Sequence, residues 1–238
     1  LGLALRAVLY ATGIDGRGLL TVNHPAAVAL WGLSGAFVIV LLILCRGITG
    51  PEAYADAYPA SAGSAAGCFA LGAALLVTGL GSYGSFQLSA DFFIWALGLC
   101  SGAGMIALGV CRLLGKKPYF LMNAALCLYI ALRMVAQYRQ WSAHPQLQDY
   151  AFYIMAYGAV MMTAYQHAAF DTGLGNHRAL WICSLGTVYL CGAALPHCEE
   201  ALLLGCFALW AITNLTALKS RKRRIRPVLQ ADTEIAEE

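Results

Sequence analysis

Charged residues are scarce in this chain of 238 residues. Lys and Arg together number 15 and Asp and Glu number 12, so that 11% of the residues are charged while 60% are hydrophobic. Soluble domains carry about 25% charged residues, so this composition excludes an ordinary water-soluble domain. Catalytic motifs are missing too. The sequence has no GxxxxGK[ST], HExxH or GxSxG, and so it gives no support for a nucleotide-driven pump, a zinc protease or a serine hydrolase.

Paired cysteine spacings are also absent. The nine cysteines include no CxxC, and all but Cys198 fall in or at the edge of apolar stretches, where a thiol behaves as a small hydrophobe. We therefore predict neither a disulfide framework nor a zinc site, and no cofactor. No carboxylate lies inside the apolar stretches, which argues against transport coupled to protons or sodium.

Long apolar runs separated by short polar links dominate what is present. A bilayer core is about 30 Å thick and takes about 20 apolar residues in a helix. Seven runs meet this length: Ala26–Cys45, Gly63–Ser82, Phe92–Cys111, Tyr119–Tyr138, Tyr150–Phe170, Ala179–Pro196 and Ala201–Leu218. We predict an all-α polytopic transmembrane helix bundle over residues 1–219, followed by a cytoplasmic tail at 220–238 that is first basic, then acidic and disordered.

The first segment, Leu1–Thr12, is apolar but only half a span long, and it contains Arg6. We expect it to be the exit half of a helix that starts before Leu1, which would give eight spans in the intact protein. The alternative is a short amphipathic segment lying on the membrane surface.

Basic residues alternate between the links, and this pattern sets the orientation, because cytoplasmic links are enriched in Lys and Arg. One set of alternate links carries eleven basic residues, whereas the other set carries only Arg17 and Arg139. The eleven are Arg46, Arg112, Lys116, Lys117, Arg178, Lys219, Arg221, Lys222, Arg223, Arg224 and Arg226. We predict a cytoplasmic C-terminus whose basic block contacts anionic lipids of the bilayer. Topology accounts for this block, so we expect no nucleic-acid partner.

Small residues recur at helical spacing, which allows helices to approach closely in lipid. Ser64, Cys68 and Gly72 share one face, and Gly98 and Gly102 form a GxxxG pattern. We expect both faces to pack within one chain, with a homo-oligomer through Gly98 and Gly102 as the alternative. Three glycines near Gly81 predict that the helix there ends, with an outer loop at 82–90.

Arg133 is the one strong charge well inside a predicted span. It lies six residues, about 9 Å, from Arg139 at the outer end, and such a charge faces a cavity or a partner unless its side chain reaches the interface. Tyr129, Arg133 and Gln137 share a face, and the next helix carries Tyr153 and Tyr157 at matching depth. Asp149 lies at the same outer end. One reading is an outward-facing polar pocket for a small anionic solute. The other is a snorkelling arginine with tyrosines that anchor the interface.

Weaker metal or proton-relay candidates lie near two links. His167, Asp171 and His177 flank a glycine turn at the inner end, and His197, Cys198 and Glu199 lie in an outer link. Neither spacing matches an established ligand motif, so we assign no metal site to them.

Three stretches together resemble an uncharacterised group of bacterial multi-pass inner-membrane proteins. They are YATGIDGRGLLTVNHP from Tyr10, LRMVAQYRQWSAHPQLQDY from Leu132 and AAFDTGLGNHR from Ala168. The resemblance implies a bacterial cytoplasmic membrane and no activity, cofactor or catalytic residue. Our leading interpretation is a non-enzymatic protein that binds or transports a small anionic solute. The alternative is a membrane interaction protein, such as a sensor, an assembly factor or a subunit of a larger complex.

Overall fold

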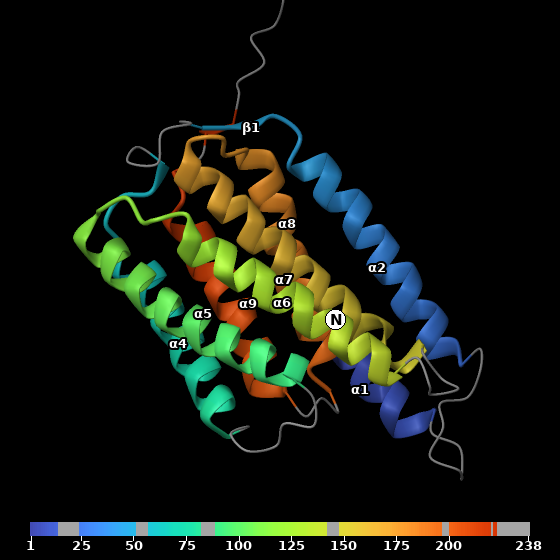
Figure 1. Cartoon of the computed structure of the whole chain (residues 1–238). Helices are drawn as coiled ribbons and strands as arrows, with labels where there is room; N and C mark the ends of the chain where they lie inside the picture. The colour runs from blue at the N-terminus through green and yellow to red at the C-terminus, as the bar shows by residue number, and fades with distance from the viewer. Residues whose placement is uncertain are drawn as a thin grey trace, which may run out of the picture.

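The described part of the chain is almost entirely helical (Figure 1). The computed structural model describes residues 1–13, 24–50, 57–81, 89–141, 148–196, 200–219 and 221–222. Its helices are α1 (Gly2–Thr12), α2 (Pro25–Leu44), α4 (Ala62–Gly81), α5 (Ser89–Leu114), α6 (Leu121–Trp141), α7 (Gln148–Thr172), α8 (His177–Ala194) and α9 (Ala201–Ala217). Two two-residue strands, β1 (Ile48–Thr49) and β2 (Arg221–Lys222), pair antiparallel.

Six helices form a closed ring. Each helix from α4 to α8 packs on the next helix in the chain, and α9 packs back on α4. Helices α1 and α2 pack on each other and on α8 outside this ring, and Figure 1 shows α2 along one flank. The ring encloses both the buried apolar side chains and the buried polar side chains described below, while α1 and α2 lie outside it.

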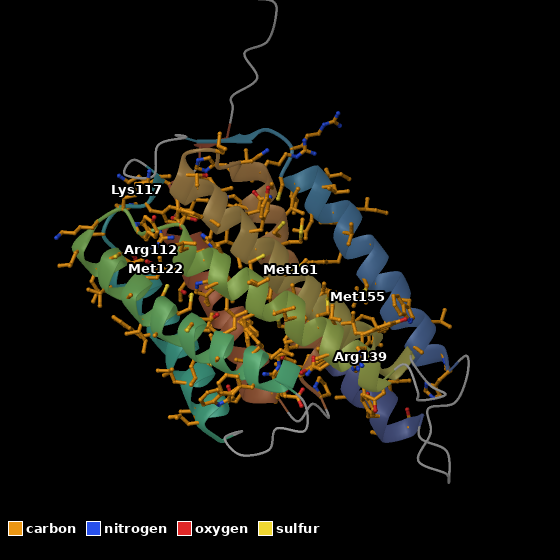
Figure 2. The ribbon with its side chains drawn as sticks, in the orientation of Figure 1. Arg112, Lys117, Met122, Arg139, Met155 and Met161 are labelled. Atoms are coloured by element: carbon orange, nitrogen blue, oxygen red, sulfur yellow. The ribbon has the colours of Figure 1, made fainter. Side chains whose placement is uncertain are left out.

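The links that carry most of the basic residues meet at one end of the ring. The link after α2 reaches the segment after α9 through β1 and β2. The amide of Lys219 donates to the carbonyl of Ala57 over 2.9 Å, and the amide of Ser61 donates to the carbonyl of Arg112 over 3.3 Å. We call this the basic end, made of residues 45–50, 57–61, 115–120, 173–176, 218–219 and 221–222. Figure 2 shows Lys117 at this end and Arg139 at the other, the opposite end.

Four helices are long and apolar enough to cross a membrane, within the part of the chain that the structure describes. These stretches are Pro25–Leu44, Ala62–Gly81, Asp91–Leu114 and Leu121–Arg139. The predicted count of seven full spans plus a half-span is not confirmed. Helices α1 and α9 are apolar but shorter, and α7 is long but carries polar residues such as Gln166, His167 and Asp171. The four apolar helices suggest a membrane protein.

Local signals explain where several helices begin and end. The ring of His24 accepts from the amide of Ala26 with Pro25 at the first position of α2, and the side chain of Asn176 accepts from the amide of Ala179 at the start of α8. Such caps satisfy amides that a helix leaves unpaired. Gly115 follows α5 with φ +64 and Gly173 follows α7 with φ +85, a region that favours glycine. Helix α4 ends at Gly81 as predicted, and the predicted loop that follows lies largely outside the described residues.

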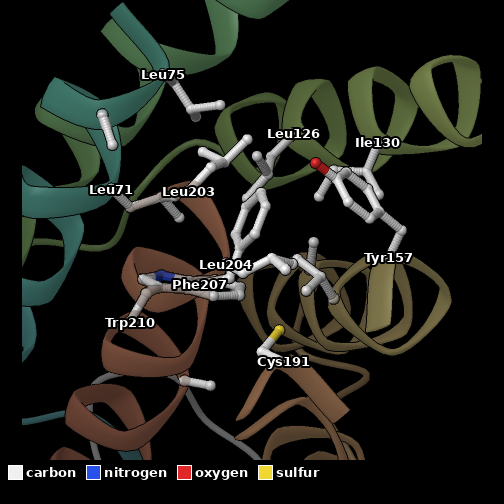
Figure 3. Close-up of a cluster of buried hydrophobic side chains, with 14 of the residues drawn as sticks. Leu71, Leu75, Leu126, Ile130, Tyr157, Cys191, Leu203, Leu204, Phe207 and Trp210 are labelled. Carbon is white, nitrogen blue, oxygen red and sulfur yellow. The ribbon is translucent and has the colours of Figure 1, made fainter. Parts of the chain in front are cut away.

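Large side chains fill the middle of the ring (Figure 3). Trp210 and Phe207 of α9 are fully buried there with Tyr157 of α7. Leu71 from α4 and Leu126 from α6 complete the cluster from the facing helices. Phe207 packs against Tyr157 and Trp210 packs against His167, so this cluster lies between the two groups of polar residues described below.

The small-residue faces pack inside the chain. A Cβ added at Gly72 would lie 2.9 Å from the carbonyl oxygen of Gly102, and one at Gly98 would lie 2.8 Å from the ring of Tyr129. Ser64 and Cys68 on the same face of α4 are fully buried. Glycine at 98 and 102 therefore allows α5 to approach α4 and α6 closely, and this placement favours packing within one chain over a dimer through these residues.

Candidate functional site

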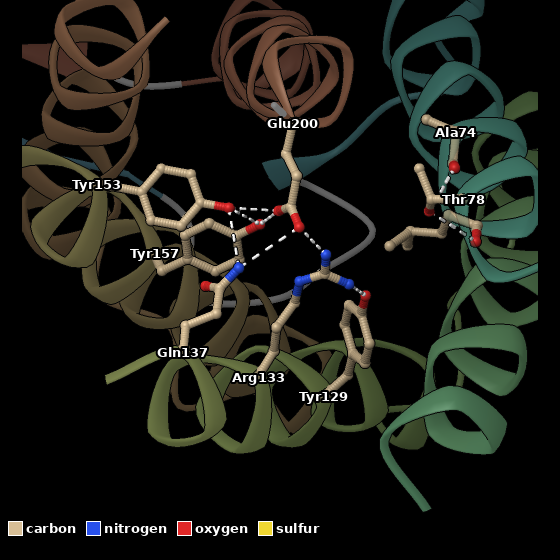
Figure 4. A network of polar contacts seen from close by, with 9 residues as sticks. Ala74, Thr78, Tyr129, Arg133, Gln137, Tyr153, Tyr157 and Glu200 are labelled. Atoms are coloured by element: carbon tan, nitrogen blue, oxygen red, sulfur yellow. Dashed lines mark hydrogen bonds and ion pairs between the residues drawn. The ribbon is translucent and has the colours of Figure 1, made fainter. Parts of the chain in front are cut away.

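A polar cluster surrounds Arg133 at the opposite end of the ring. Tyr129, Arg133 and Gln137 lie on one face of α6, and Tyr153 and Tyr157 face them from α7 (Figure 4). The tyrosines are nearly buried, with exposures of 3%, 7% and 1% for Tyr129, Tyr153 and Tyr157. The helical repeat places residues four apart on the same face, which explains why both sets converge.

The centre of this cluster is the carboxylate of Glu200, the residue just before α9. Arg133 forms an ion pair with it, and the hydroxyls of Tyr153 and Tyr157 both donate to it. The amide of Gln137 donates to Glu200 over 3.4 Å and to the hydroxyl of Tyr153 over 3.1 Å. Four side chains from α6 and α7 thus present donors to one carboxylate, which comes from the link between α8 and α9. We call these five residues the carboxylate site.

The carboxylate site pairs one positive charge with one negative charge, and both charged side chains remain partly exposed to solvent. Burial raises the pKa of Glu200, but the charge of Arg133 and the hydrogen bonds from Tyr153 and Tyr157 outweigh it, so that the pKa lies below its ordinary value of 4.5. Arg133 and Glu200 each keep 22% of their side-chain surface exposed. The guanidinium also donates to the hydroxyl of Tyr129, while its buried Nε atom has no partner among the described residues. The site therefore holds an ionised carboxylate and retains one unused donor.

Helical spacing predicted most residues of this cluster, but it did not predict Glu200. The spacing of α6 and α7 predicts that Arg133 lies near Tyr153 and Tyr157, and all three contact the same carboxylate. No acid lies inside the apolar runs to pair with Arg133; its partner Glu200 lies 67 residues further along the chain, in a link. The guanidinium points into the ring, not outward along α6 (Figure 4). Asp149 lies in the first turn of α7, and its side chain is outside the described part of the structure.

A second polar cluster lies towards the basic end. His167 and Asp171 of α7 are both buried, with exposures of 2% and 3%. Nδ1 of His167 lies 3.3 Å from the hydroxyl of Tyr58, and the amide of Asn123 donates to Asp171 over 2.7 Å. The guanidinium of Arg112, expected in a solvated link, is also buried, with its carbon 3.7 Å from the centre of the Tyr58 ring. A buried carboxylate therefore does occur within a helix of the ring.

The metal candidates do not converge. His177 packs edge-on against Phe170, with ring centres 5.0 Å apart, while His167 and Asp171 turn to Tyr58 and Asn123. Across the described ranges, no three His, Cys, Asp or Glu side chains form a group that could hold a metal ion. The other candidates, His197, Cys198 and Glu199, lie outside the described residues.

Comparison with known proteins gives no relative to interpret this site. No protein-family model, curated protein or solved structure matches the chain. The apolar helices suggest the class, a membrane protein. Any more specific function has to be inferred from the geometry of the site itself.

Proposed function

We propose that this chain is a non-enzymatic, multi-pass membrane protein that binds a small carboxylate-bearing solute at the carboxylate site. The observation that carries the proposal is the convergence of Arg133, Gln137, Tyr153 and Tyr157 on one carboxylate. Arginine and hydroxyl donors are the groups that recognise carboxylates in proteins. The carboxylate belongs to a link, whereas the donors belong to α6 and α7, so the two parts of the site come from separate segments of the chain.

In this proposal Glu200 occupies the site while no solute is bound. A solute carboxylate replaces the Glu200 carboxylate. The Nε of Arg133, which bonds to nothing in the described part of the chain, gives the solute one donor that Glu200 does not use. The exchange keeps Arg133 neutralised in both states, which avoids the cost of a buried unpaired charge. The partial exposure of both side chains supplies the route for entry.

The same proposal places the carboxylate site on the outer side of a bacterial cytoplasmic membrane. Seven helices then span it, and α1 is the half-span. Packing of α7, α8 and α9 in one ring with three of the four apolar helices supports this count. The gathering of basic links at one end supports a cytoplasmic C-terminus, in line with the positive-inside rule. Reporter fusions after residue 219 and at residue 144 should report opposite sides, and reports from the same side would overturn this topology.

Ligand screening by thermal shift tests the binding proposal. A panel of small mono- and dicarboxylates should contain at least one that raises the thermal midpoint of the purified protein. Arg133→Met should abolish that shift, whereas Arg139→Met, a matched change of the exposed arginine near the end of the same helix, should preserve it. A panel without any Arg133-dependent shift would reject solute binding at this site.

A membrane interaction protein is the second candidate, and the exposure of α2 favours it. Leu30 and Leu41 are the buried residues of α2, and its large side chains Val38, Ile39, Ile43 and Leu44 are exposed. A partner helix could cover this surface, which is more accessible than the buried Gly98 and Gly102. Crosslinking from position 39 should then capture a defined partner or a second copy of this chain, and a clean monomer would count against this candidate.

A further inference from the structure

A groove of about 640 Å³ runs along the outside of the ring between α6 and α7 and reaches the start of α8. Its lining begins at Phe120, near the basic end, and extends along α6 to Ala131. Eleven residues of helix correspond to about 16 Å, which is half of a hydrocarbon core about 30 Å thick. The groove thus has the length of one leaflet and a volume typical of ligand sites.

Small side chains create this groove. The floor contains Ala124 and Ala131 of α6 and Ala168 and Ala169 of α7, and the exposed Leu128 and Tyr165 form its rims. Alanines seven apart on α6 lie on one helical face, opposite the alanine pair of α7. Behind the floor, the bond between Asn123 and Asp171 connects the two helices. The space is therefore part of the helix packing itself.

The end of the groove near the basic end is polar, and a link with two lysines precedes it in the chain. Thr172 and Asn176 line it there, and the exposed Lys116 and Lys117 lie in the link just before Phe120. Lys117 is near enough to the end of α7 to interact electrostatically with Asp171. Figure 2 shows Lys117 at this end of the molecule. The groove is therefore an apolar channel of leaflet length whose first lining residue, Phe120, follows a link with two exposed lysines.

We propose that this groove is a binding site for one anionic phospholipid. An acyl chain lies along the alanine floor, and the phosphate lies near Lys116 and Lys117, with Thr172 and Asn176 as polar partners. The charge at the mouth selects an anionic over a zwitterionic headgroup. The site is separate from the carboxylate site and lies at the other end of the ring, so that either can fail without the other.

Native mass spectrometry of the full chain in detergent tests this proposal. The probes are palmitoyl-oleoyl phosphatidylglycerol and phosphatidylcholine, which carry the same chains. The wild type should retain one phosphatidylglycerol more tightly than phosphatidylcholine. Each lysine contributes about fivefold in affinity at an anionic headgroup, so Lys116→Gln with Lys117→Gln should weaken phosphatidylglycerol binding by about 25-fold and leave phosphatidylcholine unchanged. Arg46→Gln, an exposed cation that follows α2, is the matched control and should change neither.

Filling the groove tests the chain-binding part. Ala131→Leu with Ala168→Leu should remove retention of both lipids, while Ala103→Leu on the exposed face of α5 should not. Glycerol phosphate, a headgroup without chains, should not compete. Equal retention of the two lipids by the wild type, binding that survives groove filling, or a loss in Arg46→Gln as large as in the lysine pair would each overturn the proposal. Because both lysines are exposed, their substitution keeps the test decisive even if the filled groove prevents folding.

Discussion

The ion pair between Arg133 and Glu200 should couple α6 strongly to the link before α9. Exposed pairs contribute about 0.2–1 kcal/mol, whereas hydrogen bonds to charged groups contribute about 1.5–3 kcal/mol. With 22% of each side chain exposed and two tyrosine hydroxyls on the same carboxylate, the pair belongs near the lower part of the second range. We expect a coupling free energy of about 2 kcal/mol in a double-mutant cycle of Arg133→Met and Glu200→Gln.

Unfolding in mixed micelles, followed for the wild type, both single variants and the double variant, measures this coupling. A second cycle supplies the control. Thr163 and Thr187 share a buried neutral hydrogen bond of 2.8 Å between α7 and α8, and such bonds between membrane helices average about 0.6 kcal/mol. The cycle of Thr163→Val and Thr187→Val should therefore give the smaller value. An Arg133–Glu200 coupling no larger than the threonine coupling would refute the reasoning.

Three further outcomes follow from the same contacts. Because the folded protein lowers the pKa of Glu200, the ionised carboxylate stabilises the fold at pH values above the ordinary pKa of 4.5. This stabilisation is lost as the pH falls through the lowered pKa. Thermal midpoints measured across acidic pH should therefore fall for the wild type and change less for Glu200→Gln. Gly72→Leu should destabilise by about 1–3 kcal/mol, because its side chain would meet Gly102. Gly81→Leu, whose Cβ would meet no described residue within 4 Å, should not, and chemical unfolding checks both. Asp171→Ala should cost about 1–3 kcal/mol by leaving the buried amide of Asn123 unpaired, and Asp171→Asn, which keeps an acceptor, should cost less; equal losses in an unfolding titration would argue against that bond.

Hydropathy predicted the helices well and their ends less well. The run predicted at Ala26–Cys45 is the helix Pro25–Leu44, but the run predicted at Phe92–Cys111 extends to Ser89–Leu114. The length of an apolar run depends on which residues contact lipid or the protein core. The helix itself continues until a residue such as Gly115, with its positive φ, ends it. The charge pattern placed Arg112 in a link, but α5 continues past it and its side chain is buried.

Depth and helical spacing predicted which groups of α6 and α7 share the carboxylate site. These two helices are joined by a short link, so residues at equal depth must meet, and Arg133 lies with Tyr153 and Tyr157. Glu200 could not be placed this way, because its position depends on how the ring closes between α9 and the earlier helices. Sequence spacing predicts which residues of two consecutive helices are neighbours. It does not predict contacts between helices that are far apart in the chain and meet where the ring closes.

Chemical rescue tests the central claim, that the donors around Arg133 form a carboxylate receptor, most directly. Glu200→Ala removes the resident carboxylate and should lower the thermal midpoint. Acetate should restore part of that loss in a saturable manner, because it can bind the emptied site, and chloride at equal ionic strength should not. The double variant Glu200→Ala with Arg133→Met should gain nothing from acetate. If acetate fails to stabilise Glu200→Ala, or stabilises the double variant equally, these side chains do not constitute a carboxylate receptor.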